Sequence, residues 1–148
     1  MMRYLTFCTV CLILMACSGP EGSPEEELRE WVARGEAAAE RKDRGELLDM
    51  ISEDYADARG NDHQRIGDLL RAWFFRQRSI ALLVNIDDIL VSGDTAALMK
   101  LSVGMAGTNN STFGIRADAY KFEFELQKPD EEWLLIGARW GELGEDLH

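Results

Sequence analysis

A regular alternation of apolar and polar side chains near the C-terminus constrains the fold most strongly. The apolar members of this run are Tyr120, Phe122, Phe124 and Leu126. The positions between and after them carry Lys121, Glu123, Glu125 and Gln127. A period of two matches a β-strand, in which successive side chains point to opposite faces. The run over residues 117–128 therefore predicts a half-buried strand of the kind found in antiparallel sheets.

Three further segments have the composition of strands, because β-branched and aliphatic residues dominate them. These segments cover residues 80–91, 95–106 and 133–140. Turn or loop residues occupy 92–94, 108–112 and 129–131 between them. Short connections of this kind join neighbouring antiparallel strands, so residues 80–140 are predicted to form a four-strand meander.

Amphipathic helices are predicted ahead of the strands. Ser23 and Glu26 have the spacing of a capping box, with a proline at the first helical position. Asp43 begins a second capping signature, which an apolar stripe follows as far as Tyr55, and Asn61 opens a third helix. The expected helices cover about 24–41, 43–55 and 61–78. Helices followed by a meander predict an α+β domain, in which the helices pack on one face of a curved antiparallel sheet and leave a cone open at one end.

The first residues have the pattern of a signal peptide. Arg3 supplies a short basic region, and residues 5–16 carry no charge. At about 1.5 Å per residue, this apolar run is too short to cross a ~30 Å hydrocarbon core comfortably. We therefore interpret it as the apolar region of a signal peptide.

The end of this apolar run resembles the lipobox of bacterial lipoproteins. The motif is Leu14, Met15, Ala16 and Cys17. The resemblance implies that the chain is cut before Cys17, that Cys17 is acylated, and that the protein is anchored in a lipid membrane. Ser18 after the cysteine implies the periplasmic face of the outer membrane of a Gram-negative cell. The alternative is an ordinary secretory signal that contains a cysteine by chance.

The chain accordingly divides into four parts. These are a signal peptide (1–16), a lipidated tether rich in Gly, Pro and Ser (17–24), a folded domain (25–142) and an acidic tail (143–148) that is expected to fray. The net charge of -11 argues against nucleic acid as a partner, because phosphate binding requires clustered Lys and Arg. It also argues against attachment to anionic lipid through basic residues, so the membrane contact is expected to run through acylated Cys17.

The order of the predicted elements resembles that of nuclear transport factor 2-like domains, also called SnoaL-like or cystatin-like cone domains. The likeness rests on a first helix with Trp31, on residues 47–57 around the second helix, and on the closing strands 120–126 and 133–140. It spans about 25–142 and implies a cone-shaped barrel with a pocket between helices and sheet. Members include isomerases, dehydratases and polyketide cyclases as well as non-enzymatic binding modules, so the fold leaves the function open.

Asp57 is the candidate catalytic residue. In the ketosteroid-isomerase-like members a general-base carboxylate lies after the second helix, which is where Asp57 stands. An apolar pocket would raise the pKa of such a base and fit it for proton transfer next to a carbonyl. The alternative is structural: Asp57 caps the turn that contains Arg59 and Gly60.

A second group of candidates would bind a ligand. It comprises Tyr55, Trp73, Tyr120, Arg139 and Trp140. The alternatives are core packing for the aromatic residues and surface ion pairs for Arg139. No metal site is predicted, because His63 is the only histidine besides the terminal residue and lacks partners at ligand spacing. No cofactor motif is present either.

These observations favour an envelope lipoprotein whose non-enzymatic cone domain binds a small apolar ligand or a protein partner. The alternative is a ketosteroid-isomerase-like or polyketide-cyclase-like enzyme with Asp57 as its base. A homodimer through the outer face of the sheet is a further hypothesis. Apolar residues that point to both sides of one strand motivate it, as Leu98 and Met99 do.

Overall fold

The computed structural model describes residues 22–109 and 115–148. Cys17, the predicted signal peptide and the tether as far as residue 21 lie outside the described residues. The elements are α1 (Pro24–Glu40), α2 (Arg44–Asp49), α3 (His63–Arg76), β1 (Gln77–Ser92), β2 (Ala96–Asn109), β3 (Ile115–Gln127) and β4 (Leu134–Glu142). Among the described residues, no helix is long and apolar enough to span a membrane.

The predicted start of α1 is confirmed in detail. The Ser23 hydroxyl accepts a hydrogen bond from the backbone N–H of Glu26, and the Glu26 carboxylate accepts one from the backbone N–H of Ser23. These reciprocal bonds satisfy two amides that a helix start would otherwise leave without partners. Pro24 occupies the first turn, as predicted.

The other two helices are shorter than expected. α2 ends at Asp49 instead of continuing through Tyr55, because the next residues leave the helix to bond with β4. α3 is capped by Asp62, whose side chain accepts from the backbone N–H of Arg65, whereas Asn61 was expected to be the cap. α3 also ends earlier than expected, since β1 begins directly at Gln77.

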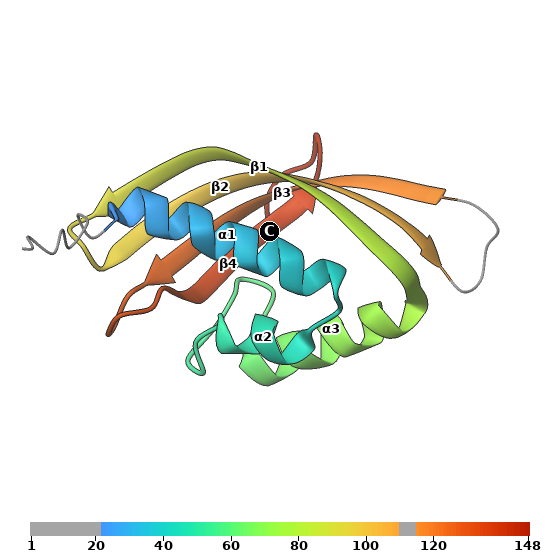
Figure 1. The fold of residues 1–148 in the computed structure, drawn as a ribbon, viewed down its shortest axis with the longest axis horizontal. Helices are drawn as coiled ribbons and strands as arrows, with labels where there is room; N and C mark the ends of the chain where they lie inside the picture. The colour runs from blue at the N-terminus through green and yellow to red at the C-terminus, as the bar shows by residue number, and fades with distance from the viewer. Residues whose placement is uncertain (1–21, 110–114) are drawn as a thin grey trace, which may run out of the picture.

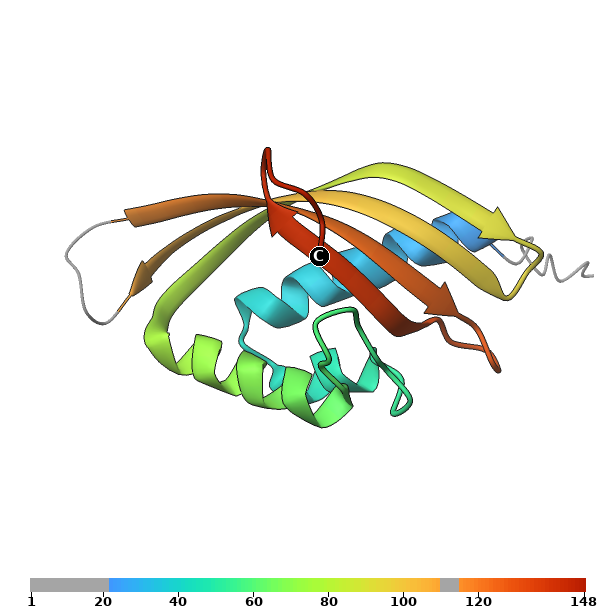
Figure 2. The same ribbon diagram turned by 180° about the vertical axis from the view of Figure 1, so that it is seen from behind.

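The sheet is an antiparallel meander in the order β1-β2-β3-β4, as predicted. Figure 1 shows that it is strongly curved and that α1 lies against its concave side, with α2 and α3 below α1. The reverse view in Figure 2 shows α3 set well away from the sheet. This arrangement confirms the α+β fold class of helices packed on a curved antiparallel sheet.

The hydrophobic core lies between α1 and the concave face of the sheet. Leu28 from α1, Met99 from β2 and Leu126 from β3 are its most completely buried large side chains. Phe122 and Phe124 pack against this cluster from the same face of β3 as Leu126. The alternation in β3 therefore places its apolar residues as the sequence predicts.

The outer edge of β4 does not lie open. The backbone N–H of Leu135 donates to the carbonyl of Met50, and its carbonyl accepts from the N–H of Ser52. The carbonyl of Ile136 accepts from the N–H of Ala56. Residues 50–56, which we call the edge segment, thus occupy backbone groups of β4 that a further strand would need.

The C-terminal tail folds back instead of fraying. The backbone of His148 exchanges hydrogen bonds with the backbone of Trp140 at 3.2 and 3.3 Å. A Cβ at Gly141 would lie only 2.8 Å from the carbonyl oxygen of Asp146, so the absence of a side chain at Gly141 permits this close approach. Acidic composition alone predicted fraying and did not reveal these backbone bonds.

Candidate functional site

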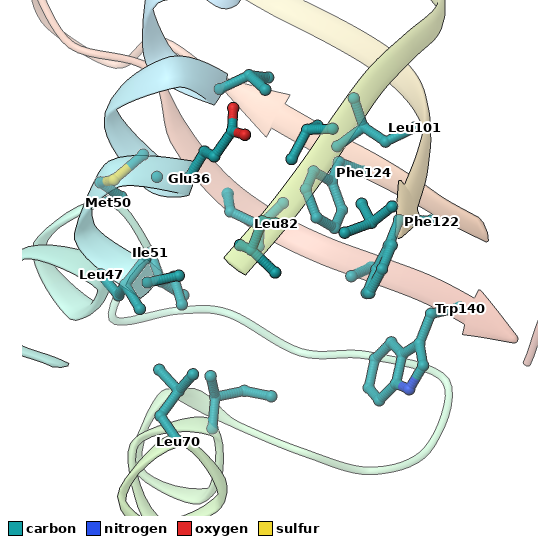
Figure 3. A pocket seen from close by; sticks show the side chains of 18 of the residues that line it. Glu36, Leu47, Met50, Ile51, Leu70, Leu82, Leu101, Phe122, Phe124 and Trp140 are labelled. Carbon is teal, nitrogen blue, oxygen red and sulfur yellow. The ribbon is translucent and has the colours of Figure 1, made fainter. Parts of the chain in front are cut away.

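A cavity of about 380 Å³ lies between the helices and the concave face of the sheet. Figure 3 shows side chains from the helices, the edge segment and the sheet around it. The helical and edge-segment walls include Trp31, Val32, Leu47, Met50, Ile51, Tyr55, Ile66, Leu69, Leu70 and Trp73. The sheet contributes Leu82, Val84, Leu101, Val103, Met105, Phe122, Phe124, Leu135, Ala138 and Trp140.

The wall of this cavity is almost entirely apolar. Although Glu36 and Tyr55 contribute to the lining, almost no polar atom reaches the cavity surface. Small-molecule sites in proteins have about 300–1,000 Å³ and a mainly hydrophobic lining. An engineered apolar cavity of about 150 Å³ holds benzene, so a space about two and a half times as large accommodates a body of two or three rings.

Tyr55 and Asp57 form a hydrogen-bonded pair at the end of the edge segment. Tyr55 is 3% exposed, and its hydroxyl donates to the Asp57 Oδ2 at 3.1 Å. Burial raises the pKa of Tyr55, and the neighbouring Asp57 charge raises it further. Tyr55 therefore presents its ring to the cavity and stays a neutral hydrogen-bond donor to Asp57.

Asp57 is the centre of a tight turn. Its carboxylate also accepts hydrogen bonds from the backbone N–H of Arg59 and from the backbone and side-chain amides of Asn61, all at 2.9 Å. Partial burial acts to raise the pKa of Asp57, but these bonds and the one from Tyr55 outweigh it and lower the pKa. Asp57 does not line the cavity. This geometry matches the turn-capping alternative.

Arg59 is a residue that the sequence analysis did not connect with the site. Its guanidinium carbon lies 4.4 Å from the ring centroid of Trp140, and one of its N–H groups donates to the Trp140 carbonyl at 2.9 Å. The Asp57 turn carries Arg59, and Trp140 lines the cavity. The turn thus holds one wall of the cavity through a cation–π contact. No sequence pattern signals this contact, which joins residues 81 positions apart.

The remaining candidates lie at different places. Trp73 lines the main cavity, and it also lines a smaller one that includes Tyr120. Arg139 lines neither cavity. It forms an ion pair with Glu123, a cross-strand neighbour on the opposite face of the sheet from Phe122 and Trp140. The reason is the strand period of two, which points Arg139 and Trp140 to opposite faces. Arg139 matches the surface-pairing alternative.

The described residues contain no cluster of His, Cys, Asp and Glu suited to a metal ion. The Nε2 atom of His63 lies 3.2 Å from the carbonyl oxygen of Leu48, across the contact between α2 and α3. His63 thus joins two helices. Of the residues that the structure describes, no histidine or cysteine lines the cavity, and Glu36 is the one carboxylate residue in its wall.

Comparison with known proteins identifies the fold. No protein-family model matches the chain, and no curated protein matches its sequence. A ketosteroid isomerase-like protein from Erwinia carotovora atroseptica SCRI1043 superposes with a TM-score of 0.67 at 12% identity, over 81% of this chain and 96% of that one. A nuclear transport factor 2-like superfamily protein from Salmonella enterica serovar Typhimurium gives 0.69 at 14% identity, over 82% and 92%.

A hexachlorocyclohexane dehydrochlorinase, type 2, superposes with a TM-score of 0.70 at 10% identity, over 84% of this chain and 88% of that one. These identities are low, so the likeness extends to the fold. The structure has the cone-shaped α+β fold of nuclear transport factor 2-like proteins, a fold that the named neighbours share although the activities in their names differ.

Proposed function

We propose that this protein is a lipoprotein of the bacterial cell envelope whose cone domain binds a small apolar ligand without chemical conversion. The observation that carries the binding role is the main cavity, which has the size of a ligand site and a wall almost free of polar atoms. Burial of apolar surface would supply the affinity, at about 25 cal/mol per Å² removed from water.

The geometry around Asp57 favours binding over catalysis. A general base needs a free lone pair within reach of its substrate and a pKa near the working pH. Asp57 instead accepts four hydrogen bonds, has a lowered pKa and does not line the cavity. The polar groups that stabilise a developing oxyanion would also have to face the ligand, whereas the cavity wall offers almost none.

The anchoring part of the proposal rests on the lipobox at residues 14–17. Two or three acyl chains on Cys17 would hold the domain at the outer membrane, since each buried CH₂ contributes about 0.8 kcal/mol. Metabolic labelling with a palmitate analogue in a Gram-negative host tests this. Labelling should disappear in Cys17→Ala and persist in Cys11→Ala, and equal membrane partition of all three chains would overturn the anchor.

Ligand binding is tested with N-phenyl-1-naphthylamine, an apolar fluorescent probe that carries a phenyl and a naphthyl group. The full chain is held in phosphatidylcholine nanodiscs, and energy transfer from the cavity tryptophans Trp31, Trp73 and Trp140 to the probe is recorded. Ala138→Leu fills part of the cavity, and Ala81→Leu makes the same change at an exposed position of β1.

Ala138→Leu should weaken binding about tenfold. The added side chain takes up space in the cavity, so the probe buries less apolar surface, by roughly the area of two CH₂ groups. Ala81→Leu should bind as the unmodified chain does. Circular dichroism establishes that both variants fold, and Val84→Phe, at another lining position, replaces Ala138→Leu if it does not. Equal energy transfer from all folded chains would mean that the signal comes from probe in the lipid, and would overturn the binding role.

We also propose that two copies pair through the convex face of the sheet. Leu83 is 76% exposed and Leu90 is 54% exposed on β1, and Leu98 of β2 is the direct cross-strand neighbour of Leu90. Leu83 lies apart from the pair Leu90 and Leu98, with Asn85 and Asp88 between them on this face. Exposed leucines on a sheet face favour an interface between subunits. Such pairing would leave the cavity, on the concave face, accessible in both copies.

A further inference from the structure

A second, smaller cavity adjoins the main one. It has a volume of about 130 Å³ and lies where α3 passes into β1. Its lining comprises Trp73, Gln77, Ile80, Met105, Ala106, Gly107, Asp118 and Tyr120. Trp73 and Met105 line both cavities, so the two spaces lie on either side of the same pair of side chains.

The second cavity differs from the first in its chemistry. Asp118 and Tyr120 stand two residues apart on β3 and therefore point to the same, concave face of the sheet. Gln77 joins them from the end of α3. Asp118 is exposed, and no hydrogen bond or ion pair joins its side chain to the side chains that the structure describes. A carboxylate, a phenol and an amide thus gather beside an otherwise apolar chamber.

Gly107 explains how Gln77 reaches this position. A Cβ at Gly107 would lie 2.7 Å from the carbonyl oxygen of Ser79 and 3.3 Å from the Gln77 Oε1 atom. The missing side chain allows β1 to approach β2 closely at the point where the strand register shifts between Gln77 and Ser79. The close approach of β1 to β2 at Gly107 therefore places the Gln77 amide in the lining of the second cavity.

The charged residues in the described lining of the two cavities are acidic. Among the residues whose side chains the structure describes, Asp118 and Glu36 are the acidic lining residues, and no lysine or arginine lines either cavity. The whole chain carries a net charge of -11. An anionic group at the second cavity would lose hydration without gaining an opposite charge from any of these described lining residues, which is unfavourable. A neutral hydroxyl or an ammonium group would instead find a carboxylate acceptor.

We propose that the ligand is an amphiphile whose hydrocarbon body fills the main cavity and whose head group, an alcohol or amine, lies against Asp118. This inference rests on the proposed binding function and specifies the ligand class for the same site. The body has about the size of two or three rings, by comparison with the benzene-sized cavity of about 150 Å³. Asp118 accepts the hydrogen bond of the head group, and the apolar wall excludes a second polar group along the body.

Four probes with one shared body test the assignment. They are 2-butylnaphthalene and its derivatives that end in a primary amine, an alcohol or a carboxylate: 4-(2-naphthyl)butylamine, 4-(2-naphthyl)butan-1-ol and 4-(2-naphthyl)butanoate. Each is titrated at pH 7 into the full chain in phosphatidylcholine nanodiscs, with tryptophan fluorescence as the readout. The same titration of Ala138→Leu gives the contribution of probe dissolved in the lipid.

The amine should bind about fivefold more tightly than 2-butylnaphthalene, the value expected for one exposed charge pair, and the carboxylate should bind most weakly. Asp118→Asn should remove the preference for the amine while leaving the affinity for 2-butylnaphthalene unchanged. Asp130→Asn, an exposed carboxylate in the turn between β3 and β4, should change neither.

The outcomes separate this inference from the proposed function. Equal binding of all four probes, or a preference for the carboxylate, would overturn the head-group assignment while the apolar cavity remains a binding site. An amine preference that survives in Asp118→Asn would also overturn it. If no probe binds more strongly to the unmodified chain than to Ala138→Leu, both the binding function and the ligand class fail.

Discussion

Glu27 of α1 contacts Lys128 and Trp133 at one end of the sheet, and its substitutions should lower the free energy of unfolding by different amounts. The Oε2 atom of Glu27 accepts two hydrogen bonds. One comes from the Lys128 ammonium at 2.6 Å and the other from the Trp133 indole N–H at 2.8 Å. The Glu27 and Lys128 side chains are 32% and 20% exposed, so water screens the ion pair only in part. Glu27→Gln keeps an acceptor for Trp133 but loses the charge that attracts Lys128.

We expect Glu27→Gln to lower the free energy of unfolding by about 1 kcal/mol at pH 7, between the values for exposed pairs and for charged hydrogen bonds. Glu27→Ala should cost about 2 kcal/mol, because it also leaves the indole N–H of Trp133 without an acceptor. Trp133 is 3% exposed, so water does not readily replace that acceptor.

The pH dependence has a definite sign. The hydrogen bonds from Lys128 and Trp133 lower the pKa of Glu27 from its usual value of 4.5. A lowered pKa means that this contribution is fully present above pH 4.5 and is lost as the pH falls through the value in the folded protein. The deficit of Glu27→Gln should therefore shrink toward zero in acid, since protonation removes the same charge from the unmodified chain.

Urea unfolding of the full chain in a nonionic detergent, followed by tryptophan fluorescence between pH 3 and 7, measures these differences. Glu30→Gln is the matched control, because Glu30 is exposed on the same helix. Its substitution should leave the free energy of unfolding unchanged at every pH. A Glu27→Gln deficit that stays constant from pH 7 to pH 3, or that equals the deficit of Glu27→Ala throughout, would refute the assignment of the ion pair.

Three further outcomes are expected. Asp57→Asn should lower the unfolding free energy by about 1–2 kcal/mol, because it weakens the turn to Asn61. Its affinity for N-phenyl-1-naphthylamine should stay within twofold of that of the unmodified chain. A loss of turnover on an identified substrate would instead favour the hypothesis of an enzyme with Asp57 as its base. Leu126→Ala should cost about 2–5 kcal/mol in urea unfolding, as removal of a fully buried leucine does, and a cost below 1 kcal/mol would contradict its central place in the core. Leu83→Lys should convert a dimer to a monomer in light scattering at micromolar concentration; a monomeric unmodified chain would contradict pairing through the convex face.

The sequence predicted those parts of the fold that short-range patterns control. The capping box of Ser23 and Glu26 has its bonding partners three residues away, and the alternation in β3 needs only a buried face on one side of the strand. Asp62 and Asn61 are both good helix caps at adjacent positions, so local preference does not choose between them. In the structure Asn61 is instead bonded to Asp57.

Long-range contacts account for what the sequence did not predict. The apolar stripe that continues to Tyr55 suggested a longer second helix, but pairing with β4 draws the edge segment out of the helix. Tyr55, Trp73 and Trp140 line the main cavity, whereas Tyr120 lines only the smaller one and Arg139 lines neither. The volume of the cavity depends on how far α3 stands from the sheet, and no residue pattern encodes that distance.

The position of the edge segment would also connect the proposed ligand with self-association. Met50, Ile51 and Tyr55 contribute to the cavity wall, and the same stretch occupies the backbone groups of Leu135 and Ile136. Without the proposed ligand these side chains would have fewer packing partners, so we expect the stretch to detach from β4 more easily. Detachment exposes an unpaired strand edge, the template on which other chains add as β-strands. If the cavity holds the proposed ligand, that ligand would therefore also protect the protein against aggregation.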